Sequence, residues 1–158
     1  MKRSVRRGQI SLVTSDRPIA PLASEPPLVS EPQRDQPLSS FGEILAQFAA
    51  KFPQVEVVVF YDEEGETVDY FSLWDPFRTR LVAAHHGVIY ESMRSRLLWM
   101  AESETQKLAY YTDFMDCATY PVGEIYRVTI LAPSGTIDTQ IQAGIDELVE
   151  VLREEAGL

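Results

Sequence analysis

Cysteine and histidine are scarce in this chain, and their scarcity excludes several kinds of site. The 158 residues include one cysteine, Cys117, so no disulfide can form within the chain, which fits a reducing cytosol. The only two histidines, His85 and His86, are adjacent. Because a zinc site needs three or four convergent ligands at a recognisable spacing, we expect no metal site, and we expect no other cofactor.

Basic residues and long apolar runs are also lacking. The chain has 14 Lys and Arg residues against 24 Asp and Glu residues, for a net charge of −10. Since phosphate binding needs clustered Lys and Arg, this balance argues against nucleic acid as a partner. No segment approaches the roughly 20 apolar residues of a membrane span, and the N-terminal apolar runs are too short for a signal peptide. We therefore expect a cytoplasmic protein without a membrane span.

Recognisable catalytic motifs are missing as well. The sequence contains no G-x-x-x-x-G-K-[ST] motif, so the chain is not itself a P-loop GTPase. No Ser-His-Asp arrangement can be assigned. The acidic run DEEGE, residues 62–66, lacks the alternating ligands of a calcium loop and fits a solvated turn. We expect no enzymatic activity and no catalytic residues.

Proline is concentrated at the N-terminus. Residues 1–38 hold six of the ten prolines and no aromatic residue, a composition typical of disordered segments. Six basic and four acidic residues give this segment a charge of +2, which leaves −12 for the remainder. We predict a disordered, Pro-rich basic arm over 1–38 and one folded domain over 39–158. The arm is either a plain flexible tail or a segment that binds a partner, contacts anionic lipid or folds back weakly on the acidic domain.

The folded part alternates helical and strand patterns. Ser40 and Glu43 form a capping box before a helix at 41–51. Asp75 and Pro76 begin a helix at 76–100, and Thr136 is the N-cap expected for a third helix. Composition predicts strands at 55–61, 66–74, 107–114, 116–123 and 124–132. The order α-β-β-α-β-β-β-α indicates an α/β fold of the α+β sandwich type.

The helix at 76–100 carries two apolar stripes, although a helix packed only on its own sheet needs one. At about 100° per residue, the first stripe contains Phe77, Leu81, Ala84, Val88 and Trp99. The second contains Val82, Ile89, Met93, Leu97 and Met100, with His86 beside them. Two interpretations remain: a homodimer formed through this helix, which we favour, or coverage by the other helices of the same chain. In the first, the dimer interface is formed by Val82, His86, Ile89, Met93 and Leu97.

A third strip of the same helix contains Arg80, Ala83, Gly87 and Arg94. Ala83 and Gly87 are small and four residues apart, so another backbone can approach closely there. This strip is our predicted partner-binding site. The alternative is that Gly87 only relieves crowding inside the fold.

The run VEVVVFYDEEGETVDYFSLWDPFRTRLVAAHHGVIYESM, residues 55–93, resembles a roadblock (dynein light-chain 7, LC7) domain. The resemblance extends over about residues 40–156 and rests on the order and spacing of the elements. It implies a five-stranded, mainly antiparallel sheet, with the long central helix on one face and two helices on the other. It also implies a dimer in which the central helix and the third strand pair across a two-fold axis.

The resemblance further implies a function. Roadblock proteins bind and regulate Ras-like small GTPases or act as adaptors, and the bacterial MglB/MglC branch controls cell polarity and motility through the GTPase MglA. Small residues four apart on the central helix contact the GTPase in that family, and Ala83 and Gly87 match them by position. We therefore expect a homodimeric regulator or adaptor that binds a Ras-like GTPase or a paralogous roadblock protein.

Two other classes of protein were weighed. A small, acidic, dimeric chaperone of the secretion type fits the net charge equally well, but it fits the order of elements less well. An enzyme of unrecognised type is disfavoured because no nucleophile and base can be paired. The sequence therefore favours the regulator or adaptor over both alternatives.

Overall fold

The computed structural model describes residues 31–158. Over this range, three helices and five strands follow one another in the predicted order. They are α1 Ser40–Lys51, β1 Val57–Asp62, β2 Thr67–Ser72, α2 Pro76–Ala101, β3 Leu108–Tyr111, β4 Met115–Val122, β5 Tyr126–Pro133 and α3 Thr139–Glu155. The expectation of disorder for residues 1–30 lies outside the described residues.

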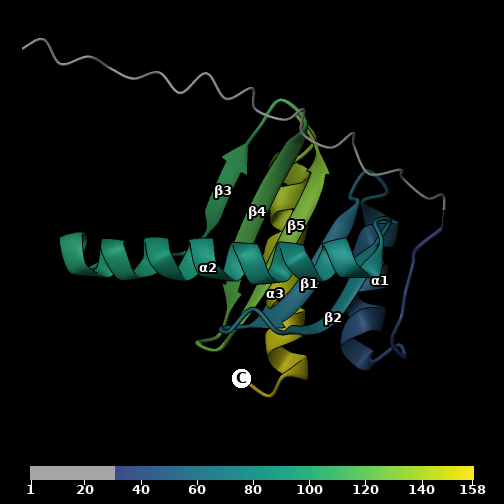
Figure 1. Cartoon of the computed structure of the whole chain (residues 1–158), viewed down its shortest axis with the longest axis horizontal. Coiled ribbons are helices and arrows are strands. Elements are labelled where there is room, and N and C mark those ends of the chain that lie inside the picture. The colour runs from purple at the N-terminus through teal and green to yellow at the C-terminus, as the bar shows by residue number, and fades with distance from the viewer. Residues whose placement is uncertain (1–30) are drawn as a thin grey trace, which may run out of the picture.

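The strands form one antiparallel sheet in the order β2-β1-β5-β4-β3. β1 and β2 pair as the predicted hairpin, and β3, β4 and β5 form a meander. Since β1 pairs with β5, the two edges of the sheet are β2 and β3. α2 lies across one face, and α1 and α3 cover the other (Figure 1). The predicted fold, with the central helix alone on its face, is confirmed.

Alternation along the strands separates two hydrophobic cores, because successive strand residues point to opposite faces. In β1, Val57, Val59 and Tyr61 belong to the core beneath α2, whereas Val58 and Phe60 belong to the core beneath α1 and α3. All five side chains are buried. The continuous apolar run in β1 therefore reflects a strand that is covered on both faces.

The helix starts differ from the predictions at two of three positions. Asp75 caps α2 as predicted. The N-cap of α1 is Ser39 rather than Ser40, and its side chain accepts a hydrogen bond from the Gly42 backbone N–H. The N-cap of α3 is Asp138 rather than Thr136, since the Asp138 carboxylate accepts from two backbone N–H groups of the first turn. In both cases a neighbouring polar residue provided an equally good sequence signal.

Between residues 31 and 158, none of the helices has the length and hydropathy that crossing a membrane requires.

Candidate partner-binding surface

α2 is the longest element and carries the surface of interest. Pro76 occupies its first turn, and the Asp75 carboxylate accepts a hydrogen bond from the Arg78 N–H at 3.0 Å. The helix ends at Glu102, which adopts the left-handed conformation with φ 49°. Its 26 residues extend about 39 Å at 1.5 Å per residue. In Figure 1 the C-terminal half of α2 projects beyond the sheet.

The side of α2 that faces the sheet is narrow and partly polar. Its buried residues are Thr79, Val82, Ala83, His86, Gly87 and Tyr90. Beyond Tyr90 no residue of α2 is buried. The buried side of the helix therefore ends at Tyr90.

Ala83 and Gly87 lie inside the fold, against the turn between β1 and β2. A Cβ atom on Gly87 would lie 3.4 Å from both the Gly65 Cα and the Tyr61 ring, and one on Gly65 would lie 2.9 Å from the Ala84 Cα. The backbone that approaches these small residues is thus the β1–β2 turn of the same chain. This agrees with the alternative interpretation, in which Gly87 relieves crowding inside the fold. In the single chain, Ala83 and Gly87 present no surface to another protein.

The predicted dimer residues divide into two groups. Ile89, Met93 and Leu97 are exposed and follow one another at intervals of four residues. Val82 and His86, from the same predicted set, are buried against the sheet. The sequence pattern therefore assigned to one predicted interface residues that the structure places on adjacent faces of α2.

The exposed side of α2 is largely apolar. Trp99 is 87% exposed and Val88 is 70% exposed. The complete set of exposed large apolar residues on α2 is Phe77, Leu81, Val88, Ile89, Met93, Leu97, Leu98, Trp99 and Met100. These residues lie on more than one side of the helix, and exposed apolar surface of this extent is typical of a surface that another molecule covers.

The edge strand β3 adds to this apolar surface. β3 pairs with β4 on one side, and among residues 31–158 no strand pairs with its other side. Tyr111, at the end of β3, is 60% exposed, and Phe114, just beyond it, is 66% exposed. An open strand edge presents unpaired backbone N–H and C=O groups, which can pair with a further strand. The roadblock resemblance implied that the third strand takes part in a dimer, but neither Tyr111 nor Phe114 was among the predicted interface residues.

His86 links α2 to β3 through a buried polar contact. Its Nδ1 lies 2.7 Å from the Val82 carbonyl oxygen, which can only accept, so Nδ1 carries the proton. Nε2 then accepts a hydrogen bond from the Tyr110 hydroxyl, and the two rings are stacked with centroids 5.6 Å apart. Burial lowers the pKa of His86 below its ordinary value, an effect that the bond to Val82 offsets in part. The imidazole is therefore held neutral.

The groups around this histidine are also kept uncharged or lie at the surface. Burial raises the pKa of Tyr110 and raises the pKa of the Cys117 thiol to about 11. Arg78 and His85 line a shallow pocket beside His86. Cys117 is buried and protonated, so it lacks the features of a reactive thiol.

A buried ion pair anchors the middle of α2 to β5. Arg127 is 2% exposed, its guanidinium bonds the Glu91 carboxylate, and the Nε–Oε1 distance is 3.1 Å. The same guanidinium lies over the Tyr90 ring, 4.9 Å from its centroid. Arg94, one of the predicted partner-binding residues, contacts the outer oxygen of Glu91 at 3.3 Å and is itself part-exposed.

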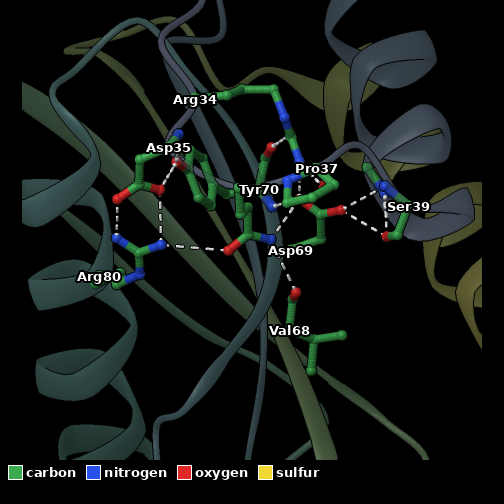
Figure 2. A network of polar contacts seen from close by, with 10 residues as sticks. Arg34, Asp35, Pro37, Ser39, Val68, Asp69, Tyr70 and Arg80 are labelled. Carbon is green, nitrogen blue, oxygen red and sulfur yellow. Dashed lines mark hydrogen bonds and ion pairs between the residues drawn. The ribbon is translucent and has the colours of Figure 1, made fainter.

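The N-terminal segment 33–37 lies along β2 and reaches α2 (Figure 2). Arg34 donates to the Tyr70 carbonyl oxygen at 2.5 Å and to the Asp69 carboxylate at 2.6 Å. Asp35 forms a two-point ion pair with Arg80 of α2, at 2.6 and 2.7 Å, and also accepts from the Tyr70 hydroxyl. Within the arm predicted over 1–38, this stretch thus makes specific contacts with the domain.

Charge pairing shapes the titration of these groups. The hydrogen bond with Arg80, followed by the one from Tyr70, holds the pKa of Asp35 well below its usual range. Burial alone would raise the pKa of Asp69, but hydrogen bonds from Ser39 and Arg34 outweigh it, so the pKa is lowered. The hydrogen bond to Asp35 raises the pKa of Arg80. The pKa shifts of Asp35, Asp69 and Arg80 therefore all favour the charged forms at neutral pH.

A hollow of about 590 Å³ lies between α3 and β4, and its lining includes carboxylates together with Lys107 and Arg153. In the part of the chain that the structure covers, no three His, Cys, Asp or Glu side chains converge to hold a metal ion.

No family model matches the sequence, and no curated protein matches it. Solved structures do match. A roadblock/LC7 domain from Streptomyces avermitilis superimposes with a TM-score of 0.68 at 14% identity, covering 73% of this chain and 97% of that one.

Two MglB structures are equally similar. MglB of Myxococcus xanthus gives a TM-score of 0.66 at 15% identity, over 75% of this chain and 98% of its own. An MglB with a tetrameric arrangement gives a TM-score of 0.67 at 16% identity, over 85% of this chain and 99% of its own. The chain therefore has the roadblock/LC7 fold, as the resemblance of residues 55–93 implied.

Proposed function

We propose that this protein is a non-enzymatic homodimeric regulator or adaptor. It binds a Ras-like small GTPase of the MglA type, another roadblock protein, or both, in the control of bacterial cell polarity and motility. The observation that supports this most strongly is the exposed apolar face of α2 beside the open edge of β3, on a fold shared with MglB.

The dimer follows from the position of this apolar surface. A monomer that exposed nine large apolar residues on one helix would leave a large apolar patch in water, which monomeric soluble proteins rarely do. A two-fold axis brings α2 and β3 of one copy against α2 and β3 of the other. The same surface patch is then buried on both copies. Ile89, Met93 and Leu97 belong at the centre of this interface.

The GTPase-binding surface is proposed on the exposed polar side of α2. Arg80 and Arg94 are accessible there, and either suits an acidic or polar partner. Ala83 and Gly87 contribute indirectly, because they let the β1–β2 turn sit close to the helix. The roadblock fold and its MglB relatives support this assignment.

The solution mass of the full chain tests the dimer. We expect the wild-type chain to elute as a dimer in size-exclusion chromatography with light scattering, and the double variant Ile89→Glu/Met93→Glu to elute as a folded monomer. Val151→Glu, which places the same charge on an exposed apolar position of α3, is the control and should remain dimeric. A wild-type monomer, or dissociation by the control, would contradict the proposal.

Binding to a small GTPase tests the function. Calorimetry with an MglA-type GTPase, loaded in turn with GDP and a GTP analogue, should give saturable binding that depends on the nucleotide. Arg94→Glu should weaken it about tenfold, the loss of one good charged contact. Capture of unfolded peptides without any GTPase binding would instead support the chaperone alternative.

A further inference from the structure

The edge strand β2 is already occupied by the chain itself. Residues 33–36 run antiparallel to β2 and satisfy the carbonyl oxygens of three alternate residues along its outer edge. The Ser72 carbonyl accepts from the Gln33 backbone N–H at 3.0 Å. The Tyr70 carbonyl accepts from Arg34 at 2.5 Å, and the Val68 carbonyl accepts from the Gln36 side chain at 3.2 Å.

The same edge presents two opposite charges on either side of an aromatic ring. Asp69 is fully buried and forms an ion pair with Arg34, while Arg80 of α2 forms an ion pair with Asp35 (Figure 2). Tyr70 lies between the two arginines, whose guanidinium carbons are 5.2 and 5.7 Å from its ring centroid. This arrangement selects an arginine followed directly by an acidic residue, in an extended chain.

We propose that the β2 edge, with Asp69, Tyr70 and Arg80, is a docking site for an extended segment of a partner protein that carries an Arg-Asp or Arg-Glu pair. Residues 33–37 are its built-in occupant and compete with that partner. The site recognises its ligand by strand addition at a sheet edge, with side-chain pockets that supply specificity. It lies at the opposite edge of the sheet from β3 and from the proposed dimer interface, but it shares Arg80 with the proposed GTPase-binding surface. Peptide binding without a GTPase therefore tests this site separately from the proposed function.

Two features make the built-in occupant replaceable. It contributes a single backbone-to-backbone hydrogen bond to β2, and each of its remaining bonds involves a side chain of at least one partner. The Asp35–Arg80 pair is about half exposed to solvent, where ion pairs stabilise weakly. A tethered occupant acts at an effective concentration in the millimolar range, so it excludes weak ligands and yields to tight ones.

The test uses the full chain with its occupant weakened by Arg34→Ala and Asp35→Ala. A fluorescent peptide with the sequence of residues 30–40 is titrated against wild-type and variant protein and followed by anisotropy. We expect the variant to bind the peptide at least about tenfold more tightly than the wild type does.

Two controls separate recognition from simple charge attraction. The same peptide with its arginine and aspartate exchanged should bind the variant at least about tenfold more weakly, and addition of Arg80→Glu to the variant should remove binding. Equal affinity for the two peptides, or no peptide binding by a folded variant, would overturn the proposal.

A milder variant covers the case in which the double substitution impairs folding, as judged by circular dichroism. Asp35→Ala alone removes the exposed ion pair with Arg80 and the hydrogen bond from the Tyr70 hydroxyl, and it retains the Arg34–Asp69 contact. It should bind the peptide about threefold more tightly than the wild type does, and affinity equal to the wild type would count against the site.

Discussion

His86 illustrates how a single residue is governed by its surroundings. Adjacent histidines suggest a metal or catalytic pair, yet the helix directs His86 into the fold and leaves His85 exposed. Burial lowers the pKa of His86 and so favours the neutral ring, although the bond from Nδ1 to the Val82 carbonyl partly opposes this effect; Nε2 accepts from the Tyr110 hydroxyl. Because neighbouring positions of a helix point about 100° apart, the two rings cannot share one ligand.

The lowered pKa of His86 predicts a pH dependence of stability. The folded pKa lies below the unfolded value of about 6.5, so the stabilisation is complete above pH 6.5 and is lost as the pH falls toward the folded pKa. In urea titrations, the difference in unfolding free energy between wild type and His86→Gln should shrink from pH 7 to pH 5. His85→Gln is the control. A difference that stays constant over this range would show that His86 does not titrate in this way.

Glu91 should be more important to stability than its exposed position suggests. Glu91→Ala leaves the guanidinium of Arg127 buried without its carboxylate, which costs about 3 kcal/mol. Arg94→Ala removes the exposed partner of the same carboxylate and should cost less than about 1 kcal/mol. Chemical denaturation of the two variants gives the comparison, and equal losses would mean that the Arg127 contact is not the stronger one.

At the scale of elements, the β1–β2 turn and α2 fit together through glycine. Gly65 has φ +84°, and its α-carbon lies against Ala84 of the helix. Gly87 in turn leaves space for Gly65. The sequence indicated a close backbone approach at Ala83 and Gly87, but it contained no information on whether that backbone is in the same chain.

Comparison of two glycines tests this fit. Gly65 and Gly135 both have positive φ, but a Cβ atom at Gly65 would lie 2.9 Å from Ala84, whereas one at Gly135 would meet nothing within 4 Å. Gly65→Ala should therefore cost about 1–3 kcal/mol more than Gly135→Ala, since both carry the conformational strain and only the first adds overpacking. Thermal or urea unfolding measures the difference, and equal losses would mean that the turn moves away from α2 at little cost.

The segment 33–37 shows the limits of local patterns. Proline content and the lack of aromatic residues indicate disorder, and Arg34 and Asp35 look like ordinary surface charges. Their partners, Asp69, Tyr70 and Arg80, are 35 to 45 positions away in the chain. No local periodicity or motif predicts a contact between residues so far apart in the chain.

At the scale of the molecule, the two edges of the sheet differ in a way that matters for assembly. The β2 edge is covered by residues 33–36, whereas the β3 edge is open and flanked by the apolar face of α2. When only one of its two edges is open, a sheet can pair with one further sheet and cannot extend beyond that. This asymmetry favours a closed two-fold dimer over an open filament.

The order of elements, the fold and the long helix with two apolar stripes were determined by the sequence itself. Hydrophobic periodicity and capping residues are local properties, and α2 and the β1–β2 hairpin follow from them directly. The assignment of each α2 face depended on tertiary structure, because Val82 and His86 turn toward the sheet and Ile89, Met93 and Leu97 turn toward solvent. Only the folded chain brings Arg34 and Asp35 to β2 and α2, since contacts between distant residues leave no trace in local spacing.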